Sequence, residues 1–296
     1  MSLSPIFFEF LFSGLVLGLL YSLMALGISF IYGVMKMVNW AMGEFYMLAG
    51  YIMLLLTTLM GTQMLFPLIP ASLAAIFSIG FLTQRFGLRP MFTSIGERRE
   101  EFVIIVTISI SVLLRSLMVG LAGPYIYKVP DYLPNISLNG IIISGNRVMA
   151  GVVAVFAIAL FFFMLKYTWI GRSLRALSQD RMAAQSLGIN VWQMDNYAFA
   201  TGVSLAAVAG VMLAPVYMVY PESGVVPAVK GFVILVMGGL GSLVGSLVGG
   251  IMLGLAESLG TALIDPKYRE VYGFLLMIAV LAVRPRGLFG RAEREV

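Results

Sequence analysis

Long apolar segments, each close to the length that crosses a lipid bilayer, follow one another along almost the whole chain. A spanning helix needs about 20 consecutive, mostly apolar residues. Hydrophobic residues make up 60% of the 296 residues and charged residues 11%, whereas average soluble proteins are about 45–50% apolar and about 25% charged. The sequence lacks the alternating strand pattern typical of transmembrane barrels. It therefore predicts an all-α, polytopic transmembrane helical bundle.

The chain is expected to form one transmembrane domain, residues 1–296, with about eight or nine spans. The seventh and eighth apolar segments meet without a real loop, so a count of eight stays open. A stretch at about 121–146 is rich in Pro, Gly, Asn and Tyr, and it is expected to be an extracytoplasmic loop. The expected spans lie at about 6–34, 39–59, 65–86, 101–120, 147–166, 191–219, 228–246, 247–264 and 269–284.

Lysine and arginine are distributed unevenly between the connections of these spans. With the N-terminus outside, 13 basic residues fall in inside segments and 4 in outside segments. Cytoplasmic loops carry an excess of Lys and Arg, so an N-out, C-in chain is predicted. The inside set is Lys36, Arg85, Arg89, Arg98, Arg99, Lys166, Arg172, Arg175, Arg181, Arg284, Arg286, Arg291 and Arg294, and the outside set is Lys128, Arg147, Lys267 and Arg269.

The sequence contains neither cysteine nor histidine. Disulfides, iron–sulfur clusters and thiol catalysis are excluded, and the commonest general base and metal ligand are missing. The run "GGLGSLVG" has the glycines of a phosphate loop but no lysine, and it lies in an apolar segment. The chain is therefore not expected to be an enzyme, and no cofactor is expected in it. Any ATP that drives its function must be hydrolysed by another polypeptide.

One polar stretch, "SQDRMAAQSLGIN", lies between two apolar segments. Ser178 is a good N-cap, and Asp180 would then fall in the first helical turn, where the helix dipole favours a carboxylate. Gly188 fits the position just after a helix end, and Asn190 can cap the next helix while Gln193 reaches back to it. The pattern predicts a short helix between Ser178 and Gly188 and a sharp corner after it.

Two interpretations of this short helix stay open on the residue pattern. It is either an ordinary interfacial helix between two spans or a rigid docking helix for a cytoplasmic partner. The small residues of "MAAQS" permit close approach, and caps at both ends limit the entropy lost on docking. Arg175 can snorkel or pair with an acidic partner, and Asp195 is expected in the first turn of the following span.

Glycines recur at helix-packing spacing in two parts of the chain. Gly14 and Gly18 form one G-x-x-x-G, and Gly245 and Gly249 form another, a spacing that lets helices approach closely. The cluster Gly238, Gly239 and Gly241 is dense for a straight helix. It is open to two interpretations, plain packing or a helix break beside a transport pathway.

Four charged residues lie in or near the expected spans. An ionisable group at the bilayer centre costs about 2.5–3.5 kcal/mol on insertion scales, so each needs a partner or water. Glu44 is expected to make a structural pair, Lys230 to lie at the outer interface, and Glu257 to be satisfied against another helix. The expected pair is Glu257 with Arg115. A proton relay is disfavoured, because no span presents two acidic groups at i, i+4 and histidine is missing.

Four stretches of the chain resemble the permeases of branched-chain amino acid ABC transporters, most closely the shorter of the two permeases that such transporters use. They are "GRSLRALSQDRMAAQSLGIN" at 171–190, "GLVLGLLYSLMALGISFIYGVMKMVNWAMGEFYMLAGY" at 14–51, "VKGFVILVMGGLGSLVGSLVGGIMLGLAES" at 229–258 and "RPRGLFG" at 284–290. The chain departs from the family pattern at Trp40 and at Met42, which stands where family members usually have histidine.

The resemblance implies an inner-membrane permease subunit that pairs with a homologous second permease, two ABC ATPase subunits and a periplasmic solute-binding protein. ATP and Mg²⁺ would be bound by the ATPases. The segment at about 167–190 would be the cytoplasmic coupling loop. The resemblance implies that ATPase coupling involves Arg175, Ser178, Asp180, Arg181, Ala183, Ala184 and Gly188, and that the candidate pathway residues are Asn39, Glu44, Gly238, Gly239 and Gly241.

Several alternatives stay open at this point. Urea, short amides and aromatic acids compete with branched-chain amino acids as substrates, because related permeases share these motifs. A passive channel or a secondary transporter would work without ATPases, and the capped cytoplasmic helix argues against it. An intramembrane enzyme has almost no chemistry available in this composition.

Overall fold

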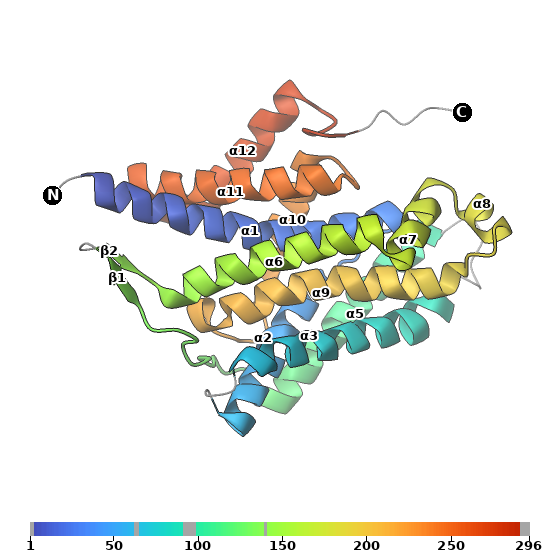
Figure 1. Cartoon of the computed structure of the whole chain (residues 1–296), viewed down its shortest axis with the longest axis horizontal. Coiled ribbons are helices and arrows are strands. Elements are labelled where there is room, and N and C mark those ends of the chain that lie inside the picture. Colours follow the sequence, from blue (N-terminus) through green and yellow to red (C-terminus); the bar gives the residue numbers. More distant parts are fainter. Residues whose placement is uncertain (1–2, 62–64, 91–98, 139–140, 291–296) are drawn as a thin grey trace.

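In the computed structural model the chain is a bundle of long helices that lie roughly along one axis (Figure 1). The structure describes residues 3–61, 65–90, 99–138 and 141–290; Arg98, Arg291 and Arg294 of the predicted inside set lie outside these ranges. The elements are α1 (Leu3–Met35), α2 (Met42–Met60), α3 (Leu65–Leu82), the π-helix η2 (Thr83–Leu88), α5 (Arg99–Ala122), β1 (Ile136–Leu138), β2 (Ile141–Ile143), α6 (Gly145–Tyr167), α7 (Trp169–Gln179), α8 (Arg181–Ser186), α9 (Val191–Tyr217), α10 (Val225–Gly238), α11 (Leu243–Leu263), the 3₁₀-helix η3 (Pro266–Tyr268) and α12 (Arg269–Val283).

Seven of the described helices are long and apolar enough to cross a membrane: α1, α2, α3 with η2, α5, α6, α9 and α11. The predicted helical class is therefore confirmed, whereas the count of eight or nine spans is not. The segments expected to span at 228–246 and 269–284 contain helices of only 14 and 15 residues, α10 and α12. At about 1.5 Å per residue, both are shorter than a hydrocarbon core of about 30 Å.

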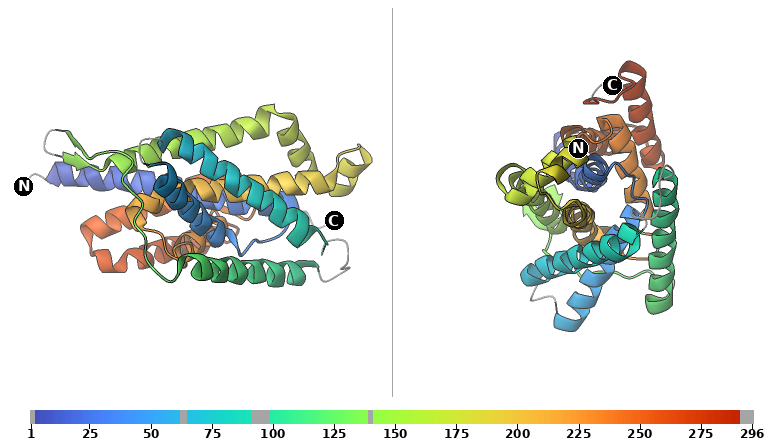
Figure 2. Two further views of the ribbon diagram at one scale, coloured as in Figure 1. Left: turned by 90° about the horizontal axis from the view of Figure 1, so that it is seen from below. Right: turned by 90° about the vertical axis from the view of Figure 1, so that its right-hand side faces the viewer.

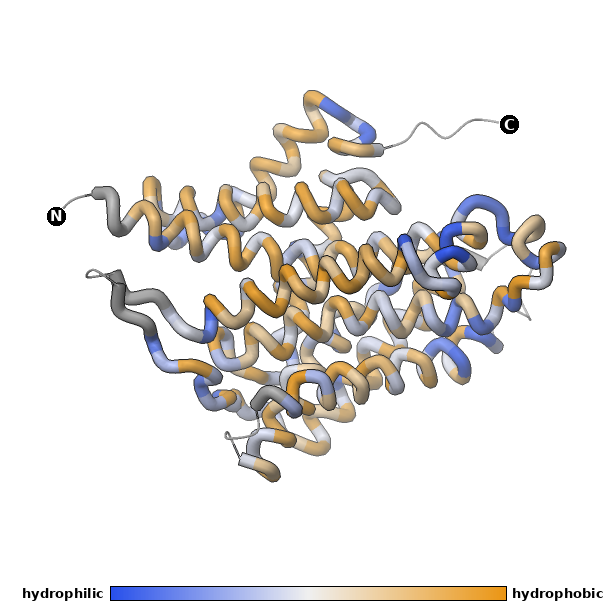
Figure 3. Tube along the Cα trace, in the orientation of Figure 1, coloured by the Kyte–Doolittle hydropathy of each residue, from blue (hydrophilic) through white to orange (hydrophobic). Residues whose placement is uncertain are grey.

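The helices α1 and α9 form the centre of the bundle. They are the most buried of the span-length helices, and their neighbours include α11, α10 and α6 around α1, and α2 and α3 around α9. The helix α5 lies at the edge of the molecule (Figure 2) and leaves most of its apolar side chains exposed. Apolar residues cover the bundle helices, and hydrophilic residues gather around α7 and α8 at one end (Figure 3).

Glycines line the contact between α1 and α11. A Cβ added at Gly14 would lie 2.7 Å from the Ser258 Cβ, and one at Gly18 would lie 2.8 Å from the Ile251 Cα. These separations are too short for a side chain, so the two helices approach as closely as their backbones allow. Gly245 and Gly249 lie on the other side of α11, where they pack against α10.

The loop between α5 and α6, predicted at about 121–146, is fixed to the bundle. Its Tyr127 pairs with Val219 in an isolated antiparallel bridge, and the strands β1 and β2 form a short hairpin within it. The buried Tyr132 hydroxyl donates to the Val211 carbonyl at 2.8 Å, and burial raises the pKa of this phenol. The loop is therefore anchored to α9.

Candidate functional site

The polar stretch between α6 and α9 contains two helices. The predicted N-cap is wrong: Ser178 lies inside α7, where its hydroxyl donates to the Arg175 carbonyl at 2.8 Å. Asp180 is the N-cap of α8 and not a first-turn residue, because its Oδ1 accepts from the amides of Met182 at 2.8 Å and Ala183 at 3.0 Å. A carboxylate that accepts two amide N–H groups satisfies two of the free donors of the helix start at once.

The predicted corner after α8 is confirmed. Gly188 has a φ of +84°, its amide donates to the Gln185 carbonyl at 2.9 Å, and the Ile189 amide donates to the Ala184 carbonyl at 3.1 Å. This pair of bonds is a Schellman helix end. The predicted cap of the next helix is also present, since the Asn190 Oδ1 accepts from the Gln193 amide at 3.1 Å.

The short helix α8 presents an apolar surface to solvent. Met182 is 80% exposed and Leu187 is 83% exposed, while Ala184 faces inward and is buried. Ala183 is exposed beside Met182. Large apolar side chains that are exposed within a polar part of the surface are typical of an interaction site.

Arg181 joins α8 to the two central helices. Its Nη2 lies 2.6 Å from the Asp195 Oδ2 in α9, and its Nη1 donates to the Val34 carbonyl of α1 at 3.1 Å. Asp195 is fully buried and is the fifth residue of α9, so the prediction that it lies in the first turn is wrong. The sequence analysis missed this pair. The sequence feature that could have indicated the pair is Asp195, a carboxylate inside an apolar span, 14 residues after Arg181.

The remaining coupling candidate, Arg175, is turned away from α8. Its Nη1 donates to the Leu165 carbonyl near the end of α6 at 2.6 Å. Arg175 therefore ties α7 to α6, whereas Arg181 ties α8 to the core.

The glycine cluster between α10 and α11 is a helix break. α10 ends at Gly238, and Gly239 and Gly241 have φ values of +101° and +76°, which only glycine adopts at little cost. The terminal motif folds back onto the break, because the amides of Leu288 and Phe289 donate to the carbonyls of Met237 at 2.9 Å and Gly238 at 3.0 Å. These bonds satisfy carbonyls that the end of α10 leaves free.

The other pathway candidates lie next to α10. The buried Asn39 accepts the Ala41 amide at 3.0 Å, and its Nδ2 has no hydrogen-bond partner among the described residues. The neighbouring Trp40 packs on Phe232 of α10 with ring centroids 4.9 Å apart. The segment before α2 and the helix α10 are therefore adjacent.

Glu44 makes a structural pair, as expected, but its partner is Arg115. The Arg115 Nη2 lies 2.8 Å from the Glu44 Oε1, and the Ser111 hydroxyl donates to the same oxygen at 2.9 Å. Glu44 is buried, while the Arg115 side chain is 38% exposed. The predicted pairing of Arg115 with Glu257 is wrong, because Arg115 is on α5 and Glu257 belongs to a separate network.

Glu257 is satisfied against other helices, as expected, and Lys230 is one of its partners. The Lys230 Nζ lies 2.5 Å from the Glu257 Oε1 and 3.2 Å from the Glu270 Oε1. The prediction that Lys230 is interfacial is wrong, because Lys230 is buried inside the bundle. Arg269 completes the network at 3.3 Å from the Glu257 Oε2, so two cations and two carboxylates join α10, α11 and α12.

The chain is similar to known transport proteins along nearly its whole length. The family described as "Branched-chain amino acid transport system / permease component" matches residues 10–281. The high-affinity branched-chain amino acid transport system permease protein BraD of Pseudomonas aeruginosa is 32% identical over 302 residues, which covers 96% of each chain. The corresponding protein LivH of Escherichia coli K12 is 32% identical over 98% of this chain and 97% of its own. A probable permease protein LivH of Methanocaldococcus jannaschii is 25% identical over 90% of this chain and 88% of its own.

Proposed function

Because this chain belongs to the branched-chain amino acid transport system permease family, we propose that it is the inner-membrane permease subunit of an ABC importer for branched-chain amino acids. The single observation that carries this proposal is a family match along nearly the whole length of the chain. The short helix α8 also supports this proposal, because it is bonded to the core through Arg181 and offers an apolar surface to a cytoplasmic partner.

The assembly that we propose contains a homologous second permease, two ABC ATPases that bind ATP and Mg²⁺, and a periplasmic solute-binding protein. Membership of a family of transport permeases supports partners of this kind. The chain itself contributes no cofactor site to the proposal, and ATP hydrolysis is assigned to the partner subunits.

We infer that the chain crosses the membrane nine times, N-out and C-in. Arg181 of α8 bonds both to Val34 at the end of α1 and to Asp195 near the start of α9, so α9 begins at the end of the bundle where α1 stops. α11 also runs opposite to α1, because Gly241 lies near Gly33 and Ser258 near Gly14. The chain must therefore return between α9 and α11, through α10 and the residues before it. α12 makes the ninth crossing, because Arg269 at its start lies beside Glu257 and Leu288 after its end bonds to Met237 at the break after α10. The lysine and arginine distribution supports the same orientation.

Coupling would run from the ATPases through α8 into α1 and α9. ATP binding closes the ATPases and carries α8 with them. Arg181 passes this displacement to the carbonyl of Val34 and to Asp195, because it is bonded to both. Substrate would move beside the start of α2 and the break after α10, where Asn39, Glu44 and the Gly238–Gly241 region lie, with weak contacts that allow release.

The test is a mild-detergent purification of the chain, tagged after Val296, from its native membrane. The expected result is co-purification of two ATPases and a second permease, with ATP hydrolysis stimulated by one amino-acid-loaded binding protein. A panel of binding proteins loaded with leucine, urea, a short amide or an aromatic acid separates the substrates. A chain that purifies alone, without ATPase activity, would favour a channel or secondary transporter instead.

A further inference from the structure

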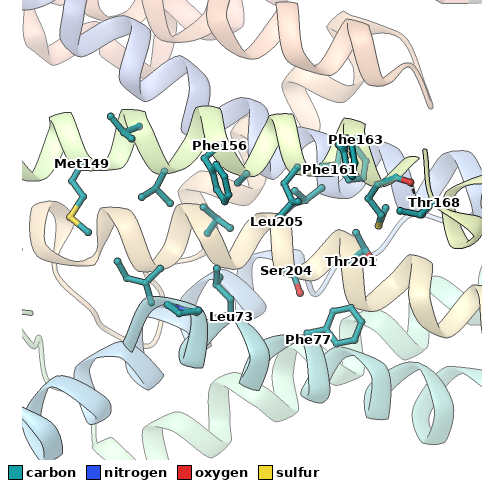
Figure 4. Close-up of a pocket in the computed structure, with 18 of the residues that line it drawn as sticks. Leu73, Phe77, Met149, Phe156, Phe161, Phe163, Thr168, Thr201, Ser204 and Leu205 are labelled. Atoms are coloured by element: carbon teal, nitrogen blue, oxygen red, sulfur yellow. Dashed lines mark hydrogen bonds between the residues drawn. The ribbon is translucent and has the colours of Figure 1, made fainter. Parts of the chain in front are cut away.

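A large open groove runs between α3, α6 and α9 (Figure 4). Its volume is about 970 Å³, and of its 20 lining residues only Thr168, Thr201 and Ser204 carry polar side chains. The hydroxyls of Thr168, just after α6, and Ser204, in α9, donate to the carbonyls of Met164 and Ala200 four residues earlier, at 2.7 Å each. The walls therefore offer apolar surface to whatever fills the groove, and all three wall helices have the length of membrane spans.

The composition of the walls favours a flexible hydrocarbon chain over a packed helix. Helices in this protein meet through glycines, as α1 and α11 do at Gly14, Gly18 and Gly254, because close backbone approach is what stabilises helix pairs in lipid. The groove lining contains no glycine and is made mainly of bulky residues such as Leu73, Phe156 and Leu160. Such walls leave an irregular space that a lipid chain can follow.

Four cations follow one end of the groove along the chain. Phe77, Thr201 and Thr168 mark this end on the three walls (Figure 4). On the α6 side the chain continues with the exposed Lys166 and Arg172, and on the α3 side it continues into η2. That π-helix and the residue after it carry the other two cations, Arg85 and Arg89. Within the described ranges, none of these four cations makes a salt bridge with a carboxylate.

Aromatic residues indicate the depth in the membrane at which this end of the groove lies. Tyr167 and Trp169 are exposed beside Thr168, and Lys166 and Arg172 lie over their rings at 5.2 and 5.8 Å from the centroids. Exposed Tyr and Trp next to cations are typical of the membrane–water interface. The groove therefore opens at the level of the lipid headgroups, and its charge there is positive.

We propose that this groove holds an acyl chain of an anionic phospholipid, whose headgroup lies between Lys166 and Arg172 on one wall and Arg85 and Arg89 on the other. The apolar walls bind the chain, and the cations select the headgroup because basic pockets at the interface attract anionic lipids. This inference needs only that the chain lies in a bilayer, so it stands or falls separately from the transport function.

The test is site-specific photocrosslinking in native membranes with a benzophenone amino acid in place of Leu160 on the groove wall. The adducts are identified by mass spectrometry and compared with the phospholipids of the whole membrane. The result expected is phospholipid adducts enriched several-fold in anionic headgroups. Replacing Lys166 and Arg172 by glutamine should return the adducts to the bulk composition, while a matched control, Lys128→Gln with Lys267→Gln, should leave the enrichment unchanged.

Three results would overturn the proposal. Adducts with the bulk lipid composition would show that the groove does not select the headgroup. An enrichment that survives Lys166→Gln with Arg172→Gln would show that these cations do not select it. A protein adduct at Leu160 would show that a second permease covers the groove. All the substituted cations are exposed, so loss of the fold does not confuse the comparison.

Discussion

At the scale of single residues, Arg181 connects a surface helix with two buried ones. Replacing it by glutamine removes the cation from a fully buried carboxylate, Asp195. Breaking a buried pair from one side costs about 3–5 kcal/mol, so Arg181→Gln should lower the melting temperature of the purified protein and abolish ATP-driven uptake.

The double variant Arg181→Gln with Asp195→Asn separates the two effects. It removes the charge together with its partner, so most of the stability should return, while uptake stays low because the ionic link to α9 is gone. Lys128→Gln is the control, because Lys128 is exposed and has no salt bridge among the described residues. Wild-type stability in the single variant would show that Asp195 does not depend on Arg181.

Gly188 supplies the left-handed corner after α8. Gly188→Val should be inserted in the membrane and assembled, yet fail in ATP-driven uptake, because a β-branched residue resists a φ of +84°. Gly61 offers a matched control, since it also has a positive φ, +78°, and open space around it, but it lies after α2. Normal uptake by Gly188→Val would show that the left-handed corner is not needed for coupling.

Local caps could be predicted from the sequence, whereas tertiary pairs could not. Gly188 and Asn190 act on their immediate neighbours, so residue type and spacing were sufficient. Asp180 and not Ser178 caps α8, because α7 continues to Gln179 and the Asp180 carboxylate accepts the amides of Met182 and Ala183. The partner of Glu257 depends on how α10 packs against α11, which no local pattern contains.

At the scale of elements, the α1–α11 contact depends on glycines with no room for a side chain. Gly254→Leu should destabilise the protein by about 1–3 kcal/mol through overpacking, because a Cβ there would meet the backbone of Gly18 at 2.4 Å. Gly120→Leu in α5 is the control, as nothing lies within 4 Å of that position. Thermal unfolding in detergent measures both, and equal melting temperatures would contradict the close contact.

Element lengths followed from the sequence wherever an apolar run had polar ends. The spans at 6–34, 147–166 and 191–219 correspond to α1, α6 and α9 within a few residues. The segment expected at 228–246 does not form one helix, because Gly239 and Gly241 end α10 inside an apolar run. Hydropathy alone does not reveal that break, although the glycine cluster indicated it.

At the scale of the whole molecule, α5 is a largely exposed span that carries a charged residue, Arg115, within its length. It packs on the bundle weakly, and Arg115 is 38% exposed on it. A partly exposed guanidinium is costly against lipid, so we expect the second permease to cover this face. The chain has no cysteine, which allows a single cysteine at Leu113 to carry a photoactivatable crosslinker.

The expected result is a crosslink from Leu113→Cys to the second permease in the assembled complex. Leu160→Cys, on the groove of α3, α6 and α9, should give no such product. A protein adduct at Leu160 and none at Leu113 would place the permease interface on the opposite face.

The caps around α8 make the segment from Asp180 to Asn190 nearly self-contained. Each end closes with hydrogen bonds inside the segment or to the first turn of α9, and Arg181 supplies the link to Val34 and Asp195. Such a segment is modular. Grafting the equivalent segment of another permease into this chain should redirect it to a foreign ATPase, provided that the arginine and its buried aspartate travel together.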